Sequence, residues 1–164
     1  MAQKHYAQVG TFHVTTNTRG KIPWCTFKGV PEILIQNLFN SRNIHEAKIF
    51  SFCILPNHMH ILLETNEKDL SSFMKSFKRN AIRDIRTMLI RRRRLQSAPA
   101  DINQIKWQRN FHDEFIRDTQ QRNNALAYVS YNAWRHGMTG EMNDWPWSSV
   151  HYPHLLDPME IWFS

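Results

Sequence analysis

The stretch from Ile49 to Leu63 constrains the fold of this chain more than any other segment. It holds two apolar runs that are joined by Pro56-Asn57, a dipeptide typical of turns. The simplest interpretation is a β-hairpin, in which a strand, a tight turn and a second strand follow one another directly. The first question for function is therefore what this hairpin carries.

Two histidines, His58 and His60, open the second apolar run with only Met59 between them. Side chains alternate between faces along a strand, so both imidazoles project from one face and Met59 from the other. Two imidazoles placed in this way can hold one divalent cation. The alternative is a pair of histidines satisfied by ordinary hydrogen bonds, because His-x-His arises by chance in a chain with nine histidines. The stretch alone leaves both interpretations open.

The charge balance of the chain indicates a polyanionic partner. There are 21 Lys and Arg residues against 14 Asp and Glu residues, which gives a formal net charge of +7 over 164 residues. A domain this basic most often binds nucleic acid, although a basic protein without such a partner is the alternative. An anionic membrane surface fits less well, because no long helix pairs a basic face with an aromatic one.

Cysteine usage and hydropathy indicate a cytoplasmic location without a membrane anchor. Cys25 and Cys53 are the only cysteines and form no C-x-x-C pattern, so neither a cysteine-rich zinc site nor a disulfide framework is expected. Residues 1–6 have no apolar signal-peptide core. The apolar run 49–55 is far shorter than the roughly 20 residues that a membrane span requires.

Local patterns outside the hairpin predict alternating strands and helices. Residues 11–16 are β-branched and aromatic and predict a first strand, and another strand is expected within 111–117. Pro31 opens a helix that is expected to end near Asn40 or Asn43.

A longer helix is expected to begin at Asp69 or Ser71 and to run into Arg91–Arg94. Apolar residues recur on one face at spacings of three and four. The other face carries Lys75, Lys78, Arg79, Arg83 and Arg86. A charge run of this kind is usually a solvated helix surface, and the alternative is a stripe that contacts phosphates.

This helix is expected to end at a short loop at 97–100. A last helix is expected from Thr119 to Arg135. This order of elements predicts an α+β fold, a ferredoxin-like sandwich with a mainly antiparallel sheet and helices packed on one face. No linker or repeat divides the chain, so one domain is expected over residues 1–164, with its core at about 12–152.

Tyr128 and Asn132 are four residues apart on the last predicted helix and therefore share a face. If that face packs over the strand that carries His58 and His60, a phenol, an amide oxygen and two imidazoles converge. Free phenol has a pKa of about 10, so a tyrosine nucleophile needs activation, which a metal that polarises the phosphate can provide. The alternative is ordinary packing and surface polarity for both residues.

Four motifs occur in order and together resemble one known family. They are Pro56-Asn57-His58-Met59-His60-Ile61-Leu62-Leu63, Trp107-Gln108 with Phe111-His112-Asp113, Tyr128-x-x-x-Asn132, and Trp145-Pro146-Trp147-Ser148-Ser149. The chain resembles the single-tyrosine HUH transposases of insertion sequences, and within them the REP-associated tyrosine transposases, which act on palindromic DNA repeats. The resemblance extends from about Phe12 to Tyr152.

This resemblance implies a specific chemistry. His58 and His60 match the paired metal ligands, Tyr128 the nucleophile, and Asn132 the polar third ligand, with magnesium or manganese as the metal. The tyrosine would cleave single-stranded DNA, leaving a 5′-phosphotyrosine link and a free 3′-hydroxyl, and the reverse step would rejoin strands. A homodimer that exchanges the tyrosine helix is also possible in this family, and no nucleotide cofactor is implied.

The chain departs from the family pattern in two places. Many relatives have Asn-Pro after the tyrosine, whereas this chain has Asn132-Ala133. A second tyrosine, Tyr131, lies nearby, but the residue four positions after it is Arg135, which is not a metal ligand. Tyr128 is therefore the expected nucleophile.

Basic and aromatic residues supply the expected DNA contacts, with strong salt dependence and a preference for hairpins that have an unpaired flank. Trp107, His112 or Trp147 could stack on an unpaired base. The alternative for each of them is a position in the core. The residues expected to contact DNA are Arg19, Lys21, Lys75, Lys78, Arg79, Arg83, Arg86, Trp107 and His112.

Three other classes of function remain as alternatives. A structured-DNA-binding protein that does not cut needs the basic face alone. A metal-dependent phosphodiesterase would use water and release its product without a protein–DNA bond. A structural protein with an incidental histidine pair would show no dependence on metal in any assay.

Overall fold

The computed structural model describes residues 9–66, 69–95 and 101–159. Its elements are, in chain order, β1 (Gly10–Asn17), the 3-10 turns η1 (Arg19–Lys21) and η2 (Trp24–Thr26), α1 (Val30–His45), β2 (Lys48–Leu55), β3 (His58–Thr65), α2 (Leu70–Leu95), η3 (Ile102–Gln104), β4 (His112–Phe115), α3 (Thr119–Ser130), α4 (Asn132–Arg135), η4 (Ser149–His151) and η5 (Pro153–Leu155). The predicted loop at 97–100 and residues 1–6 lie outside the described residues.

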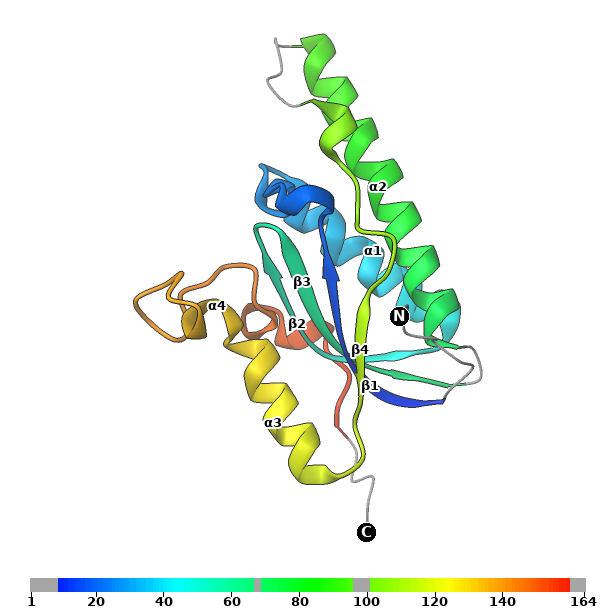
Figure 1. Cartoon of the computed structure of the whole chain (residues 1–164), viewed down its shortest axis with the longest axis vertical. Helices are drawn as coiled ribbons and strands as arrows, with labels where there is room; N and C mark the ends of the chain where they lie inside the picture. Colours follow the sequence, from blue (N-terminus) through cyan, green and yellow to red (C-terminus); the bar gives the residue numbers. More distant parts are fainter. Residues whose placement is uncertain (1–8, 67–68, 96–100, 160–164) are drawn as a thin grey trace.

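The four strands form one antiparallel sheet in the order β2-β3-β1-β4. α1 connects β1 to β2, and β3 inserts between these two strands, which is the split β-α-β arrangement of ferredoxin-like folds (Figure 1). The predicted hairpin is present, with Leu55 paired to His58 across the Pro56-Asn57 turn. The predicted α+β class is confirmed.

α1 and α2 cover one face of the sheet and enclose the main core. Phe12, Met59 and Ile61 project from the strands into this core and are fully buried. Met59 therefore points away from its two histidine neighbours, as strand alternation predicts. Of the two predicted caps of α2, Asp69 acts as one: its Oδ1 accepts a hydrogen bond from the backbone N–H of Ser72 (2.6 Å).

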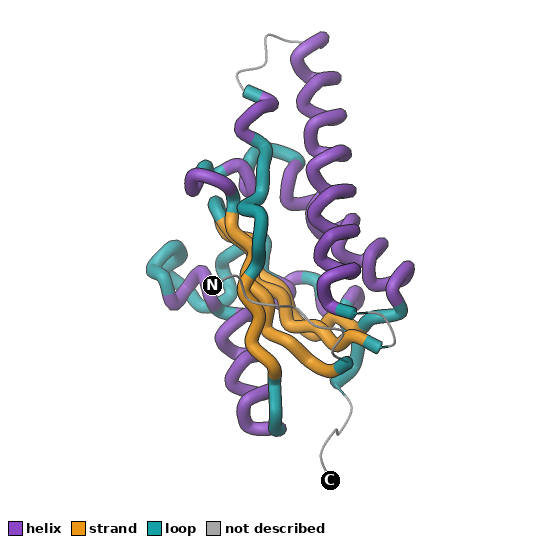
Figure 2. Tube along the Cα trace, turned by 45° about the vertical axis from the view of Figure 1, so that its right-hand side comes forward, coloured by secondary structure: helices purple, strands orange, loops and turns teal. Residues whose placement is uncertain are grey.

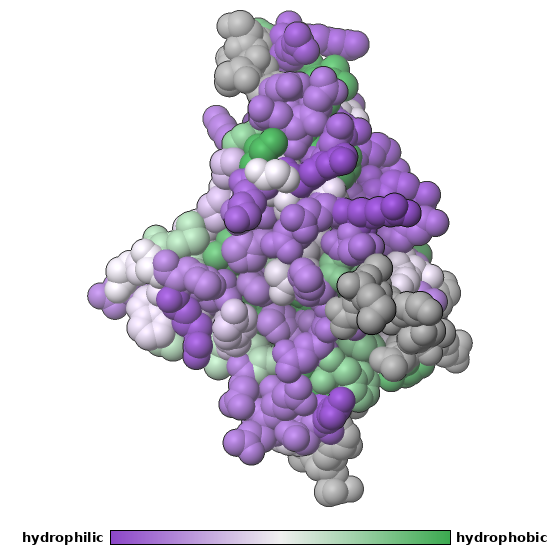
Figure 3. Space-filling model, in the orientation of Figure 1, coloured by the Kyte–Doolittle hydropathy of each residue, from purple (hydrophilic) through white to green (hydrophobic). Residues whose placement is uncertain are grey.

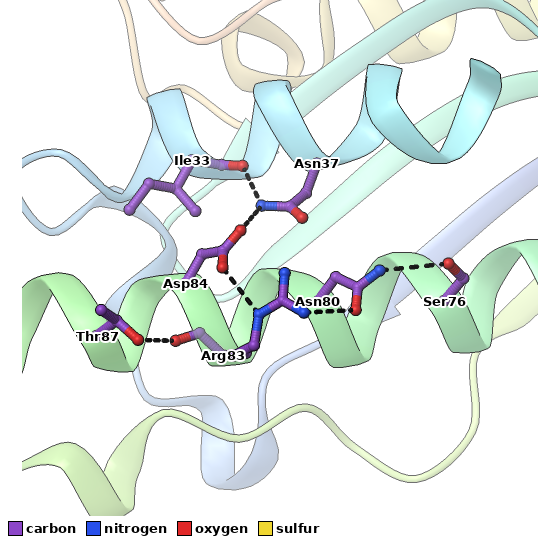
Figure 4. Close-up of polar contacts among 7 residues, drawn as sticks. All are labelled: Ile33, Asn37, Ser76, Asn80, Arg83, Asp84 and Thr87. Carbon is purple, nitrogen blue, oxygen red and sulfur yellow. Dashed lines mark hydrogen bonds and ion pairs between the residues drawn. The ribbon is translucent and has the colours of Figure 1, made fainter. Parts of the chain in front are cut away.

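A polar contact between the buried Asn37 and the half-buried Asp84 joins α1 to α2 (Figure 4). Nδ2 of Asn37 donates to Oδ2 of Asp84 (3.0 Å) and to the carbonyl of Ile33 (3.0 Å). The other oxygen of Asp84 accepts from Nε of Arg83 (3.0 Å), whose Nη1 also faces Oδ1 of Asn80 (3.4 Å). The Arg83 guanidinium is thus partly engaged by its own helix.

α3 and α4 lie on the opposite face of the sheet from α2 (Figure 2). Ala125 and Val129 of α3 pack against Phe50 and Leu62 of the sheet in a second, smaller core. The sequence predicted helices on one face; the structure has α1 and α2 there and adds this second layer. Within the described ranges, none of the helices combines the length and apolar character needed to cross a bilayer.

The segment 145–149 runs beside β2, which is an edge of the sheet. Nε1 of Trp145 donates to the carbonyl of Ile54 (2.7 Å), and the Ile54 N–H donates to the carbonyl of Trp147 (2.9 Å). Unpaired backbone groups of an edge strand can pair with another chain and cause aggregation. Here the aromatic segment 145–149 provides hydrogen-bond partners for some of them.

Candidate active site

The sheet face beneath α3 gathers four polar side chains from its two central strands. His58 and His60 share this face on β3, and the register pairs His60 with Thr15 and Leu62 with His13. Because directly paired residues in an antiparallel sheet project to the same side, His13 and Thr15 of β1 join the histidine pair. His13 lies 47 residues before His60 in the chain, and its Nε2 is 3.0 Å from Nδ1 of His60.

Hydrogen bonds engage the same ring nitrogen on both histidines of the pair. Nδ1 of His60 is 3.0 Å from Thr15 Oγ1 and 3.0 Å from His13 Nε2. Nδ1 of His58 is 2.7 Å from Oδ1 of Asn57, to which a protonated Nδ1 donates. In the tautomer whose Nδ1–H donates to its neighbour, the lone pair of each Nε2 is left for a cation, which is how neighbouring groups commonly orient metal-binding histidines.

Burial keeps these imidazoles neutral. Desolvation and, after it, the nearby His13, His58 and His136 together lower the pKa of His60 to about 3. Burial also lowers the pKa of His58 and, against an opposing effect of Glu114, the pKa of His13. A neutral imidazole is the form that binds a metal, so the histidine pair is ready to act as ligands at neutral pH.

Tyr128 projects from α3 over these histidines. Its ring centroid lies 5.6 Å from that of His60 and 5.5 Å from that of His13, with edge-to-face geometry. The side chain is 36% exposed, and it lines a pocket of about 480 Å³ together with His13, Thr15, His60 and other residues. A phenol beside neutral imidazoles in an open pocket can reach a substrate that enters from solvent.

Asn132 lies at a break in the last predicted helix. α3 ends at Ser130, Tyr131 leaves helical geometry (φ −112°, ψ 21°), and α4 begins at Asn132. The sequence predicted one continuous helix with Tyr128 and Asn132 on one face. The break lets Tyr128 stay half-exposed while Asn132 is fully buried, and the two side chains do not line the same pocket.

The surroundings of Asn132 suit a cation ligand. Among the described residues, neither its Oδ1 nor its Nδ2 has a hydrogen-bond partner, although the side chain is 0% exposed. Ala133 packs against Cys53 and Leu55 of β2, which pair with His60 and His58 on β3, so α4 lies level with the histidine pair. Buried polar atoms without partners are rare, and an absent ion is one recognised reason for them.

The donor set is compatible with magnesium or manganese. No three or more His, Cys, Asp and Glu side chains cluster as metal ligands in the described part of the chain. A site built here would therefore combine two imidazoles with an amide oxygen. Such a set leaves positions for water or phosphate oxygens, as catalytic cation sites require.

A basic groove of about 900 Å³ lies between α2 and the segment 105–111. Strongly hydrophilic side chains gather over α2 (Figure 3). Two of the basic residues hold the groove together: Nζ of Lys78 donates to the carbonyls of Gln108 (2.8 Å) and Arg109 (3.4 Å), and Nη2 of Arg86 donates to the carbonyl of Ile105 (2.8 Å). Burial lowers the pKa of Lys78 to about 8.

The other predicted DNA contacts fall in different places. Arg19 and Lys21 are exposed on η1, and His112 is exposed at the start of the edge strand β4. Trp107 lines the groove but is only 9% exposed, because its ring packs against Trp24 at a centroid distance of 4.6 Å. This burial favours the alternative position in the core for Trp107, and its role as a stacking platform for a base stays a prediction.

Sequence reasoning missed His13 as a member of this site and did not assign a role there to Arg135. A signal for His13 was present, because His13, Thr15 and Asn17 alternate with buried Phe12 and Val14 along β1. The guanidinium carbon of Arg135 lies 5.4 Å from the ring centroid of Tyr128, in the same pocket. No local pattern indicated that contact.

Comparisons with known proteins identify the family of this chain. The family model described as IS200-like transposase matches residues 10–132. A Haemophilus influenzae protein described as a REP-associated tyrosine transposase is 31% identical over 107 residues, which are 62% of this chain and 57% of that relative. The chain thus spans little more than half the length of this relative. The REP-associated tyrosine transposase of Escherichia coli K12 is 22% identical over 151 residues, which are 91% of this chain and 81% of that protein.

A solved structure shares the fold. The structure of a REP-associated tyrosine transposase bound to a REP hairpin matches with a TM-score of 0.73 at 22% identity, and the match covers 96% of this chain and 88% of that one. The family model extends from β1 through the histidine pair and Tyr128 to Asn132. This chain belongs to the IS200-like transposase family, together with the REP-associated tyrosine transposases that it resembles.

Proposed function

We propose that this protein cleaves and rejoins single-stranded DNA at hairpin-forming repeats through a covalent bond to Tyr128. The observation that carries the proposal is the position of Tyr128, half-exposed in an open pocket with its ring beside His60 and His13. A water nucleophile would require no tyrosine there. A protein that only binds DNA would require neither the tyrosine nor neutral histidines.

His58, His60 and Asn132 would hold magnesium or manganese. The bound cation would supply Lewis-acid polarisation of the phosphate that is attacked. Thr15 and His13 keep His60 in one orientation through its Nδ1, and Asn57 does the same for His58.

The covalent step uses the phenol of Tyr128. Its Oη forms a bond to phosphorus as the bond from phosphorus to the 3′-oxygen breaks. The phenol proton leaves, and the 3′-oxygen departs as a hydroxyl, so the 5′ end stays on the protein as a phosphotyrosine ester. Attack of a 3′-hydroxyl on that ester reverses the step and rejoins a strand.

The basic groove supports a DNA substrate with a structured part. It lies on the α2 side of the sheet, whereas the pocket of Tyr128 lies on the α3 side. A DNA that occupies both must pass the edge strand β4, where His112 is exposed. One solved structure of similar fold is described as bound to a REP hairpin, and we extend that substrate class to this chain.

A denaturing gel tests the proposal. The protein is mixed with Mn²⁺ and a labelled hairpin oligonucleotide whose single-stranded flanks are randomised, with and without chelator. We expect a label on the protein that needs metal, that is lost in Tyr128→Phe and that persists in the matched control Tyr131→Phe. Cut DNA without a labelled protein would instead identify water as the nucleophile.

A mixing experiment separates action within one chain from action between two. Tyr128 lies beside His60 of its own chain. We therefore propose that one chain completes its site, with a homodimer as a further possibility for the assembled protein. Mixed Tyr128→Phe and His60→Ala variants should then form no adduct, whereas exchange of the tyrosine helix would restore it.

A further inference from the structure

Arg135 lies in the pocket of Tyr128 and is a candidate for contact with the substrate. It is the last residue of α4, its side chain is exposed, and its guanidinium carbon is 5.4 Å from the centre of the Tyr128 ring. The residues that line this pocket include no other lysine or arginine. Among the described residues, no carboxylate or carbonyl accepts a hydrogen bond from the Arg135 side chain.

The backbone of Arg135 is held firmly, and among the described residues its guanidinium contacts the Tyr128 ring without donating a hydrogen bond. Its N–H donates to the carbonyl of Tyr131 (3.0 Å), and α4 is anchored by the buried side chains of Asn132 and Ala133. The nearest carboxylate in the pocket, Glu114, accepts a hydrogen bond from Nε2 of Gln121 (2.9 Å). A fixed cation with unused donors therefore faces the space that a substrate phosphate must enter.

We propose that Arg135 is a catalytic residue that binds a non-bridging oxygen of the scissile phosphate. This inference rests on the proposed attack by Tyr128. Charge in phosphoryl transfer is spread over the non-bridging oxygens, and a guanidinium presents planar paired donors that match them. Donors that are already aimed at the developing charge accelerate such a step because they need not reorganise.

The contrasting role for Arg135 is structural. A cation over an aromatic ring within about 6 Å is attractive in itself, so in this role Arg135 would only hold Tyr128 in place. The two roles differ in what they require of the DNA. A phosphate contact depends on one particular non-bridging oxygen, whereas ring stacking does not depend on the phosphate at all.

Methylphosphonate linkages distinguish these roles. The hairpin sequence that wild-type protein captures from the randomised pool is made with one methylphosphonate at the scissile position, as two separated diastereomers, each of which lacks one charged non-bridging oxygen. Single-turnover rates of adduct formation are measured for wild type, Arg135→Gln, Arg135→Lys and the charge-matched control Arg117→Gln. Arg117 is exposed and does not line the pocket.

On the natural phosphodiester we expect Arg135→Gln to lower the rate by about 10²- to 10³-fold, with a smaller loss for Arg135→Lys. On one diastereomer the penalty of Arg135→Gln should vanish, and on the other it should persist. Equal penalties on both diastereomers, or no penalty on the phosphodiester, would overturn the assignment while leaving Tyr128 chemistry intact. Failure of wild type to capture any member of the pool would overturn the proposed function and this inference together.

Discussion

The lowered pKa of His60 keeps its imidazole neutral and also makes the stability of the fold depend on pH. Its pKa falls from the ordinary value of 6.5 to about 3, first through burial and then through nearby His13, His58 and His136. Between these two pH values the unfolded chain binds a proton that the folded chain does not. The free energy of unfolding therefore rises with pH, so the contribution is complete above pH 6.5 and is lost as pH falls towards 3.

This linkage predicts that acid destabilises the metal-free protein through His60. From pH 6.5 to 5 the loss from this residue should be about 2 kcal/mol, because one differential proton is worth about 1.4 kcal/mol per pH unit. Urea unfolding at both pH values compares wild type with His60→Gln and with the exposed control His154→Gln. The His60 variant should lose about 2 kcal/mol less than wild type, and the control should follow wild type; equal losses in all three would contradict the prediction.

Replacement of Asn132 by an apolar residue should raise the stability of the fold and weaken metal binding. Its buried amide has no hydrogen-bond partner among the described residues, and a buried polar group left unsatisfied costs about 1–3 kcal/mol. Asn132→Leu should therefore raise the stability of the metal-free protein by roughly 1 kcal/mol or more. The same variant should bind Mn²⁺ more weakly in a calorimetric titration.

The matched control is Asn123→Leu, which makes the same change on an exposed position of α3. It should leave Mn²⁺ affinity unchanged and should not stabilise the fold. If Asn132→Leu bound Mn²⁺ as tightly as wild type, Asn132 would not be a ligand, and its unpaired amide would need a different account.

At the scale of elements, four serines fasten α3 to the edge of the sheet. Oγ of Ser51 lies 2.8 Å from Oγ of Ser130 and 3.0 Å from Oγ of Ser149. Oγ of Ser149 also accepts from the N–H of Phe52 (3.0 Å), and Oγ of Ser148 donates to the carbonyl of Ser130 (2.6 Å). The aromatic segment that carries Ser148 and Ser149 thus holds the end of the helix that bears the nucleophile.

Removal of one member of this cluster should cost stability. Ser149→Ala leaves the N–H of Phe52 and the hydroxyl of Ser51 short of a partner in a buried place, so we expect a loss of about 1–3 kcal/mol in the free energy of unfolding. The exposed control Ser72→Ala should change it by less than about 0.5 kcal/mol. A loss in Ser149→Ala no greater than in the control would mean that the cluster does not fasten α3.

Most elements of this fold were predictable from local patterns, whereas their neighbours in space were not. The turn signal Pro56-Asn57 predicted the hairpin. The apolar face and the cap at Asp69 predicted α2. The alternation along β1 indicates the face on which His13 lies, but its position beside His60 follows from the pairing of β1 with β3, which no local pattern indicates. The break at Tyr131 was missed because it serves the burial of Asn132 rather than any turn preference of its own.

At the scale of the whole molecule, the sheet separates two surfaces with different roles. The second helix layer was not predicted because α3 is mostly polar and buries few side chains, among them Arg122, Ala125 and Val129. The pocket of Tyr128 lies under this layer, and the basic groove lies on the other side along α2. Chemistry and electrostatic attraction therefore depend on separate residues, and substitutions should affect them separately.

The basic residues on α2 fall into two groups: those whose side chains are hydrogen-bonded within the protein, and those whose side chains are open to a ligand. Lys78 and Arg86 donate to carbonyls of the segment 105–109, and Arg83 is engaged by Asp84. Lys75 and Arg79 are exposed, and their side chains form no hydrogen bond or ion pair with another residue in the described ranges. These two are the residues of the stripe that are free to neutralise phosphates.

We therefore expect Lys75→Gln/Arg79→Gln to weaken binding of a fluorescent hairpin in a salt-dependent way. Each phosphate contact contributes about −0.9 to the slope of log affinity against log salt, so loss of two should flatten the slope by about 2. Anisotropy titrations from low to moderate NaCl measure it, with Tyr128→Phe as the background to prevent covalent capture. The charge-matched control Lys28→Gln/Arg117→Gln removes two exposed cations outside the groove and should leave the slope nearly unchanged; an equal flattening in the control would assign the attraction to net charge rather than to α2.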